Sequence, residues 1–326
     1  MKITAQANAN IALIKYWGKR NLKLNLPLNN SISLTLDKLN TTTTVEFSQK
    51  HKNDIFILNN KEENPQKISD HLNIVRKKAK INLHAKVESK NNFPTACGLA
   101  SSSSGFAALS LAAAKAAKLN LSHQELSILA RKGSGSASRS IFGGFSEWEK
   151  GQKSLDESSF AKQILAPQDW LDFRIIISVL TQKQKVTSSR EGMLKTVLTS
   201  PMYKCWLNSI NTDLKEMKKA ITQKNFSLVG NIAELNCLKM HSTMLTSNPP
   251  LLYWLPQTVE IIHAIWNWRK QGLEAYFTID AGAQVKIMCQ KKDIQNVEIK
   301  LKSFDIIKTI VCKPGEDAKI INQHLF

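Results

Sequence analysis

The segment of this chain with the clearest chemical potential covers residues 94–105 and reads Pro-Thr-Ala-Cys-Gly-Leu-Ala-Ser-Ser-Ser-Ser-Gly. It continues into an alanine-rich stretch, ending near Lys118, whose composition predicts a helix. Small residues let backbone N–H groups approach an anion, serine hydroxyls add donors, and the positive end of the helix dipole lies behind them. An ordinary helix cap would need only one or two serines, so four serines between Gly98 and Gly105 favour a nucleotide triphosphate site. No lysine follows the glycine, so the segment is not a Walker A loop.

Two clusters near opposite ends of the chain carry groups that could act on an anionic ligand. Residues 8–19 read Asn-Ala-Asn-Ile-Ala-Leu-Ile-Lys-Tyr-Trp-Gly-Lys, in which Tyr16 and Lys19 offer a phenol and an ammonium group. Residues 276–284 place Asp280 at the end of an apolar strand beside small residues, where a carboxylate could face a closely approaching ligand. A solvated lysine and a turn aspartate are the alternatives.

Two further clusters combine small residues with an arginine. Residues 133–144 read Gly-Ser-Gly-Ser-Ala-Ser-Arg-Ser-Ile-Phe-Gly-Gly, so backbone donors precede the planar fork of Arg139. Residues 186–192 contain Ser189 and Arg190, which could form a second anion clamp. The alternatives are a flexible loop for the first cluster and a capped helix start with a solvent-facing arginine for the second.

The chain of 326 residues is strongly basic, since 45 lysines and arginines exceed 26 acidic residues by 19. Such a charge attracts polyanions, but it does not distinguish nucleic acid, membrane surface and small phosphorylated substrates. The lysines are scattered without interleaved aromatic residues, which disfavours a dedicated nucleic-acid stripe. Apolar content of 42% and charged content of 22% are typical of a soluble globular protein.

The remaining composition argues against a secreted, membrane or zinc protein. Five cysteines are widely spaced, odd in number and not paired as Cys-x-x-Cys, as in a reduced cytoplasmic protein. No apolar leader or segment of about 20 apolar residues occurs, so we expect no membrane association. The seven histidines show no metal-ligand spacing, so we expect no protein metal site and Mg²⁺ only with the nucleotide.

Hydrophobic periodicity predicts an α+β protein in two parts. Strands are predicted over residues 3–16, 31–37, 41–47, 54–58, 83–88, 174–180, 275–279, 284–289 and 306–311. Besides the alanine-rich stretch, helices are predicted over residues 66–80, 124–131, 200–224, 226–244 and 255–271. A polar segment over residues 182–190 suggests a domain boundary, with domains at 1–182 and 183–326.

Together the motifs are similar, in order and approximate spacing, to those of mevalonate diphosphate decarboxylases of the GHMP kinase superfamily. The motifs are Lys-Tyr-Trp-Gly-Lys at 15–19, the serine segment at 94–105, Gly-Ser-Gly-Ser-Ala-Ser-Arg at 133–139, Ser-Ser-Arg at 188–190 and Ile-Asp-Ala-Gly at 279–282. The resemblance implies an N-terminal ribosomal-protein-like α+β domain that binds ATP and a C-terminal ferredoxin-like α+β domain.

The resemblance also implies an activity: ATP-dependent decarboxylation of mevalonate 5-diphosphate to isopentenyl diphosphate, releasing ADP, phosphate and CO₂. This is a step of the mevalonate pathway of isoprenoid and sterol biosynthesis. Transfer of the γ-phosphoryl group to the tertiary 3-hydroxyl would come first, and loss of that phosphate would drive CO₂ release. A cytoplasmic homodimer using ATP and Mg²⁺ is implied as well.

Site roles follow from the resemblance by position. The ATP phosphates would be held by Gly98, Leu99, Ala100, Ser101, Ser102, Ser103 and Ser104. The substrate's diphosphate and carboxylate would be held by Tyr16, Trp17, Gly18, Lys19, Ser134, Gly135, Ser136, Ala137, Ser138, Arg139, Ser189 and Arg190. Asp280 would contact the 3-hydroxyl as general base or positioning group, with Lys19 nearby to lower its pKa. Lys67 stands near the position where some relatives have an arginine.

Two alternatives remain open. One is a same-fold kinase that phosphorylates mevalonate or phosphomevalonate at the 3-position, or a monophosphate decarboxylase. The remote one is a basic nucleic-acid-binding protein, because the first domain of this superfamily resembles a ribosomal-protein fold.

Overall fold

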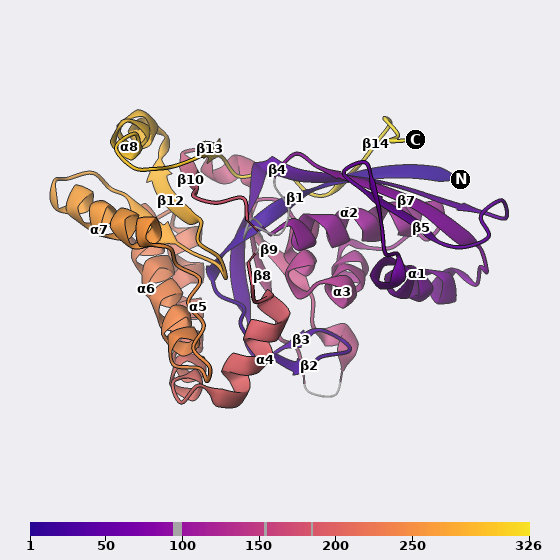
Figure 1. Ribbon diagram of the computed structural model, residues 1–326, viewed down its shortest axis with the longest axis horizontal. Coiled ribbons are helices and arrows are strands. Elements are labelled where there is room, and N and C mark those ends of the chain that lie inside the picture. Colours follow the sequence, from indigo (N-terminus) through magenta and orange to yellow (C-terminus); the bar gives the residue numbers. More distant parts are fainter. Residues whose placement is uncertain (94–99, 153–154, 184) are drawn as a thin grey trace.

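The chain folds into two adjoining lobes, each built on its own β-sheet (Figure 1). A computed structural model describes residues 1–93, 100–152, 155–183 and 185–326. Both termini lie on the N-terminal lobe, because the last strand returns to the first sheet.

The larger sheet belongs to the N-terminal lobe. In the described chain its strands are β1 (Lys2–Ile14), β4 (Ser31–Ser48), β5 (Ile55–Leu58), β6 (Lys61–Glu63), β7 (His84–Asn91), β8 (Phe145–Trp148), β9 (Ala161–Leu165) and β14 (Lys319–Ile321). Their order is β14-β1-β4-β7-β5-β6, with β8 and β9 beside the first half of β4. A separate short hairpin joins β2 (Lys19–Asn21) and β3 (Leu26–Pro27) just after β1.

The long strand β4 organises this sheet. Two predicted strands, over residues 31–37 and 41–47, are one strand of 18 residues, since both halves pair with β1. The register shifts between Asn8 and Asn10, and β4 changes its other neighbour from β8 to β7. The sheet therefore has a straight outer part and an inner part that reaches toward the second lobe.

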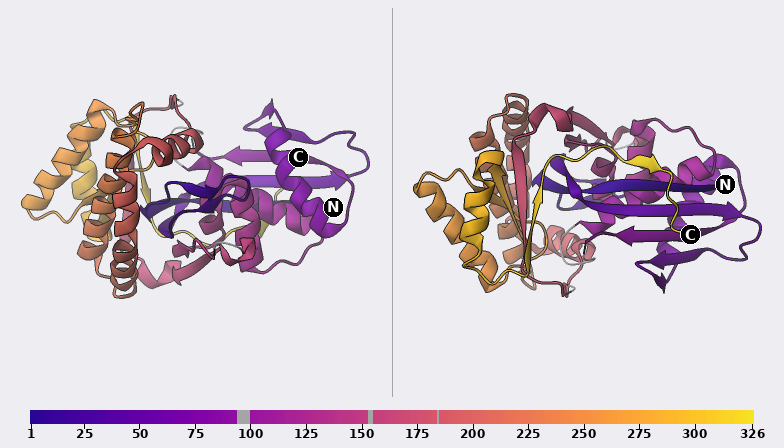
Figure 2. Two further views of the ribbon diagram at one scale, coloured as in Figure 1. Left: turned by 90° about the horizontal axis from the view of Figure 1, so that it is seen from below. Right: turned by 90° about the horizontal axis from the view of Figure 1, so that it is seen from above.

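Helices cover one face of this sheet, as the two views of Figure 2 show. They are α1 (Gln66–Ala79), α2 (Ser101–Ala116), α3 (His123–Gly133) and the 3₁₀ segment η1 (Gly135–Ile141). Helix α2 lies in the middle, with its small buried alanines packed on β1 and β4. Alanine permits this close approach, which fixes the start of α2 relative to the ends of both strands.

The C-terminal lobe packs helices on a four-stranded antiparallel sheet ordered β11-β12-β10-β13. Its strands are β10 (Phe173–Val179), β11 (Tyr276–Thr278), β12 (Val285–Gln290) and β13 (Lys308–Cys312). Its helices are α4 (Ser189–Thr199), α5 (Tyr203–Thr222), α6 (Phe226–Leu245), α7 (Pro256–Lys270) and α8 (Ile294–Leu301). Short 3₁₀ segments complete the described chain: η2 (Asp156–Ser158), η3 (Pro167–Trp170) and η4 (Lys291–Asp293).

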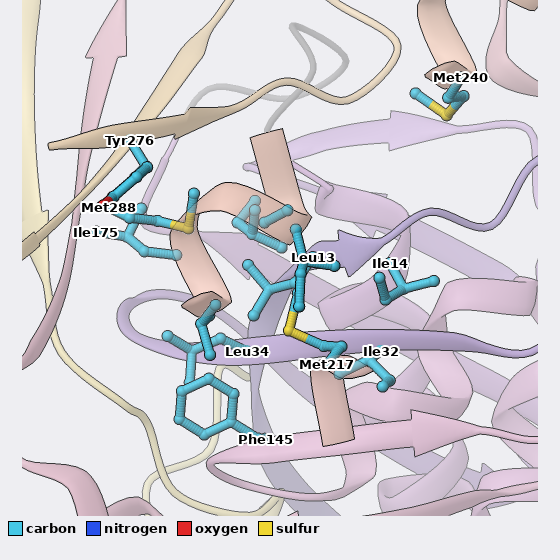
Figure 3. Packing of buried hydrophobic residues seen from close by; sticks show 14 of the residues in the cluster. Leu13, Ile14, Ile32, Leu34, Phe145, Ile175, Met217, Met240, Tyr276 and Met288 are labelled. Atoms are coloured by element: carbon cyan, nitrogen blue, oxygen red, sulfur yellow. The ribbon is translucent and has the colours of Figure 1, made fainter. Parts of the chain in front are cut away.

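One hydrophobic core joins the lobes. Figure 3 shows side chains from β1 and β4 packed among side chains from α5, β10 and β12, including Leu13, Leu34, Met217, Ile175 and Met288. All five are essentially removed from solvent. The lobes therefore share buried apolar surface, and their inner strand ends are held in a fixed relation.

The α+β class and two-lobed architecture agree with the prediction, but some elements differ. Strand β10 precedes the boundary suggested at residues 182 and 183 yet pairs in the second sheet, and β14 pairs in the first. The periodicity did not predict α4, nor the shorter elements β9, α8 and β14. In the part of the chain that the structure describes, no helix has both the length and the apolar character needed to cross a bilayer.

A pair of helix glycines offers a test of the packing. A Cβ at Gly230 in α6 would overlap the ring of Tyr276, whereas one at Gly105 in α2 would meet no described atom within 4 Å. We expect Gly230→Ala to lower the free energy of unfolding by about 1–3 kcal/mol, because the core is overpacked. The matched Gly105→Ala should raise it by about 0.5–1 kcal/mol. Chemical denaturation measures both, and a stabilised Gly230→Ala would contradict the packing described here.

Candidate active site

A cavity of about 430 Å³ opens where the inner ends of β1, α2 and η1 meet α4 and the β11–β12 connection. Its lining contains several cationic side chains and, among the described residues, a single carboxylate. The lining residues are Asn10, Ala12, Lys15, Tyr16, Trp17, Lys19, Lys67, Ala100, Ser101, Ser102, Gly133, Ser134, Gly135, Ser136, Arg139, Lys185, Ser188, Ser189, Arg190, Met193, Met240, Asp280 and Ala281.

The carboxylate of Asp280 is held by two lysines. Lys15 Nζ lies 2.7 Å from Asp280 Oδ1, and Lys286 Nζ lies 3.6 Å from Oδ2. Burial alone would raise the pKa of Asp280, but Lys15, Lys286 and Arg139 outweigh it and lower that pKa to about 2. The group is therefore a carboxylate at any pH at which the protein would work, and it can accept a hydrogen bond from a ligand.

Arg139 lies in the floor of the cavity on η1. Its Nε donates to Ser33 Oγ over 2.8 Å, its Nη2 donates to Asn10 Oδ1 over 3.2 Å, and its Nη1 donates to Ser31 Oγ. These bonds leave one N–H on each terminal nitrogen for a planar anion such as a carboxylate. Burial lowers the pKa of Arg139 to about 10, so the guanidinium stays charged at neutral pH.

A second group of cations lines the cavity, and in the described part of the chain neither Lys19 nor Lys67 is within ion-pair distance of a carboxylate. Lys19 Nζ donates to the neutral Asn25 Oδ1 over 2.5 Å, and Lys67 Nζ lies 5.6 Å from the centre of the Phe106 ring. Burial and repulsion from Arg190 and Lys67 lower the pKa of Lys19 to about 8. Mutual repulsion of this kind is relieved when a polyanion binds.

The N-terminus of α2 points into the same cavity. Ala100, in the left-handed conformation at φ 58°, precedes the helix, and Ser101 and Ser102 line the cavity. Ser103 and Ser104 instead lie inside the fold, where their hydroxyls donate to the carbonyls of Ala100 and Ser101. Gly98 and Leu99, also predicted to hold ATP, lie outside the described residues. The first N–H groups of a helix point along its axis, and together with the helix dipole they make this end suitable for phosphate.

Helix α4 brings in the predicted clamp from the second lobe. Ser188 and Glu191 form a capping box, in which Ser188 Oγ accepts from the Glu191 N–H over 3.2 Å. The segment is thus a capped helix start, and Ser189 and Arg190 nevertheless line the cavity. Lys185 Nζ donates to Ser189 Oγ over 2.6 Å and to the Ala281 carbonyl over 2.8 Å, which links α4 to the loop carrying Asp280.

The other predicted residues divide into two groups. Tyr16, Trp17, Ser134, Gly135 and Ser136 line the cavity. The remaining three, Gly18, Ala137 and Ser138, are buried outside this lining.

Close packing explains why small residues occur around the phenol of Tyr16. A Cβ on Gly135 would come within 2.9 Å of Tyr16 Oη and 2.8 Å of the Trp148 ring. Gly18 has φ +107°, and a side chain there would overlap the Tyr203 hydroxyl. Tyr16 Oη is buried and has no hydrogen-bond partner among the described residues, so it can bind a ligand oxygen.

One expectation about the catalytic group was wrong. Lys15 and Lys286, rather than Lys19, contact Asp280 and lower its pKa. Lys15 was visible only as part of a motif, and nothing in the sequence near Lys286 signals a buried amine. The sequence analysis also missed the three residues that accept hydrogen bonds from Arg139, because they come from other strands. These residues are Asn10, Ser31 and Ser33.

Within residues 1–93, 100–152, 155–183 and 185–326, no three His, Cys, Asp or Glu side chains are grouped to hold a metal ion. The oxygen donors of the cavity are mainly serine hydroxyls, with one carboxylate among the described residues. Such a set suits Mg²⁺ that takes most of its oxygen ligands from phosphates and water.

A basic cleft between two α+β lobes, with a serine-rich helix start facing a carboxylate, defines a small-molecule phosphotransfer enzyme of the GHMP kinase superfamily. Residues 7–161 match the model for the diphosphomevalonate decarboxylase-like N-terminal domain. Residues 175–320 match the mevalonate 5-diphosphate decarboxylase C-terminal domain. The chain belongs to the diphosphomevalonate decarboxylase family.

Individual relatives agree. The diphosphomevalonate decarboxylase of Saccharomyces cerevisiae is 37% identical, over 98% of this chain and 84% of its own. The human protein of that name is 34% identical, over 87% and 76%. The mevalonate diphosphate decarboxylase structure from Staphylococcus aureus has a TM-score of 0.93 at 43% identity, covering 98% of both chains. The enzyme from Enterococcus faecalis has a TM-score of 0.91 at 42% identity, covering 99% of both.

The lowered pKa of Lys19 predicts how anion binding depends on pH. Lys19 is charged below about pH 8 and loses its charge above it, so affinity for a phosphorylated ligand should fall as the pH rises through 8. Calorimetric titration with inorganic pyrophosphate between pH 6.5 and 9.5 measures this. Lys19→Arg, whose charge persists, is the control and should flatten the decline at high pH. An equal decline in both proteins would rule out Lys19 as the titrating group.

Proposed function

We propose that this chain catalyses the ATP-dependent decarboxylation of mevalonate 5-diphosphate to isopentenyl diphosphate, with release of ADP, phosphate and CO₂. The observation that carries the proposal is the carboxylate of Asp280, held by Lys15 inside a cavity whose other charged lining residues, in the described part of the chain, are all cations. Both substrates are polyanions, and the tertiary alcohol of mevalonate 5-diphosphate needs an acceptor for its proton.

The relatives support the same reaction. A structure with 42% identity and a TM-score of 0.93, aligned over 99% of both chains, is described as "MDDEF in complex with MVAPP, AMPPCP and Magnesium". A complex that holds MVAPP and AMPPCP together supports two anion-binding regions in this chain, one around Arg139 and one at the start of α2.

In this reaction the first task of the protein is positioning. The start of α2 with Ser101 and Ser102 holds the ATP phosphates, while Lys19 and Arg190 hold the diphosphate of the substrate. The open edge of Arg139 fits the substrate carboxylate. With both ends fixed, the 3-hydroxyl is held in line with the γ-phosphorus, and such orientation supplies a large share of rate enhancements.

Asp280 orients the hydroxyl more than it deprotonates it. A carboxylate whose pKa is about 2 is a weak base, but it is always ionised and able to accept the hydroxyl proton's hydrogen bond. Phosphoryl transfer through a loose transition state needs little nucleophilic push, so the proton can leave late in the step. Lys15 is close enough to stabilise negative charge as the phosphoryl group moves.

The second step removes phosphate and CO₂. The 3-phosphate leaves with the C–O electron pair, and the electrons of the carboxylate's C–C bond form the new double bond. Cations around the 3-phosphate stabilise the negative charge that develops on it as the C–O bond breaks. When bound, Mg²⁺ neutralises phosphate charge, and Ser101 and Ser102 are the hydroxyls that could join its coordination.

A cytoplasmic homodimer completes the proposal. The cysteines Cys205, Cys237, Cys289 and Cys312 are free thiols, which suits a reducing compartment. Light scattering after size-exclusion chromatography decides the oligomeric state, and a monomer would contradict the homodimer.

We expect Asp280→Ala to reduce turnover at least about 100-fold while leaving ATP binding nearly unchanged, since Asp280 holds the reacting hydroxyl and the start of α2 holds the ATP phosphates. The assay follows ADP and CO₂ in parallel with mevalonate, its 5-phosphate and its 5-diphosphate. ADP without CO₂ would favour a 3-kinase, and CO₂ from the monophosphate would favour a monophosphate decarboxylase. Retention of more than about a tenth of the wild-type rate by the variant would contradict the role of Asp280.

A further inference from the structure

The backbone at Lys15 is held by side chains where β1 ends. The N–H of Lys15 donates to Asn236 Oδ1 over 2.8 Å, and its carbonyl accepts from Asn29 Nδ2 over 2.8 Å. The pairing of β1 with β4 shifts register between Ala12 and Ile14, just before this point. Both asparagines are buried, Asn236 completely. Two side-chain amides thus replace the sheet bonds at this residue.

Asn236 is itself oriented by a carboxylate. Asn236 Nδ2 donates to Asp213 Oδ2 over 2.7 Å, and Lys239 Nζ lies 2.8 Å and 3.0 Å from the two oxygens of Asp213. An ionised carboxylate only accepts hydrogen bonds, so the amide must turn its NH₂ group to Asp213. Its carbonyl oxygen is then left for the N–H of Lys15. Helices α5 and α6 of the second lobe therefore fix a peptide group of the first.

That peptide group carries the lysine that contacts Asp280. Lys15 is 1% exposed, and its Nζ donates to the Ala12 carbonyl over 2.8 Å and to Asp280 Oδ1 over 2.7 Å. The side chain leaves β1 in a direction set by its backbone. A shift of the peptide would move the ammonium group away from Asp280, and displacements of about 1 Å are costly in active sites.

We propose that Asn236, oriented by Asp213, is a positioning residue that holds Lys15 in place so that its ammonium group stays on Asp280. Neither residue lines the cavity, so both act through Lys15. The proposal rests on the proposed function, because it assigns Asp280 to the reacting hydroxyl. It goes further in assigning a role in the active site to two hydrogen-bonded residues of the second lobe, Asp213 and Asn236.

Other groups around Asp280 determine how far its pKa would change if the contacts from Asp213 and Asn236 to Lys15 were lost. Lys286 on β12 and Arg139 on η1 add positive charge, and Cys237 and His241 face it from α6. Burial lowers the pKa of His241 to about 3 and raises that of Cys237 to about 11, so both are neutral near pH 7. Loosening Lys15 would weaken one of three cations, and the pKa of Asp280 would rise without returning fully to that of a buried, unpaired acid.

The test uses the whole enzyme and the variant Asn236→Ala. We expect kcat to fall about tenfold or more while KM for the diphosphate substrate changes less than about threefold, because the diphosphate contacts are untouched. Carbon-13 NMR of aspartate carboxyl groups, assigned with Asp280→Asn, should show Asp280 titrating about one pH unit higher than in the wild type. A generally loosened fold would not move that titration selectively.

Exchanging Asn236 and Asp213 gives a sharper test. Asn236→Asp places two carboxylates against each other and should lose activity. The double variant Asn236→Asp with Asp213→Asn restores an acceptor toward Lys15 and a donor between the two side chains, and it should recover most of kcat. If Asn236→Ala fails to fold, this pair decides the question.

Glu234→Gln serves as the matched control. Glu234 is a similarly buried acid on α6, but it binds Arg269 and Trp266. We expect its kcat and the Asp280 titration to stay near those of the wild type.

Three results would overturn the proposal: a folded Asn236→Ala with kcat within threefold of the wild type, an unmoved Asp280 titration in that variant, or an exchange variant no better than Asn236→Asp. The proposed function fails separately, if the wild type releases no CO₂ from the diphosphate. The Asp280 titration needs no turnover, so it tests the position of Lys15 in either case.

Discussion

The ion pair between Lys15 and Asp280 is the interaction on which the site depends, because its two members come from different lobes. Burying a carboxylate costs several kcal/mol unless it is paired and hydrogen-bonded. Here Lys15 and Lys286 contact opposite oxygens, and the lowered pKa of Asp280 indicates that their attraction outweighs the desolvation. Such a pair persists only if the lobes keep a fixed relation, which the core shared by β1, β4, α5 and β10 supplies.

The rest of the cleft carries an excess of positive charge. Burial is the main cause of the lowered pKa of Lys19 and Lys67, and repulsion from Arg190 lowers both further. A fold can tolerate such repulsion where a ligand relieves it, because ligand binding adds stability by mass action. The net charge of +19 extends this attraction over the surface, yet the concentration of cations in a concave cleft selects small polyanions over an extended nucleic acid.

Local patterns in the sequence were enough to predict many of the residues that line the cavity. The serine-rich helix start, Arg139, Ser189, Arg190 and Asp280 stand out because their type and small neighbours are legible over a few residues. The contacts that join these residues could not be predicted from the sequence. Lys15 and Asp280 are 265 positions apart, and two lysines four residues apart at a strand end give no sign of which one faces the other lobe.

The fold shows the same division between local and distant information. Helices such as α1 and α6 repeat their apolar residues often enough to be predicted within a few residues. Strand β14 has three residues, and its place beside β1 depends on a partner some 300 positions away. The cap of α4 was legible, since Ser-x-x-Glu at 188–191 is a capping box, but its direction toward the cavity depends on Lys185 and the loop of Asp280.

The low pKa of Asp280 makes it a weak base, and a loose transition state explains why a site of this kind can use one. If the hydroxyl had to be deprotonated before attack, a carboxylate with pKa near 2 would be poorly matched to the task. In a loose transition state the phosphoryl group has largely left ADP before the new bond forms, so position matters more than basicity. A carboxylate fixed by two lysines gives up basicity and gains a defined direction, and a residue that fixes Lys15 then influences the rate through that direction.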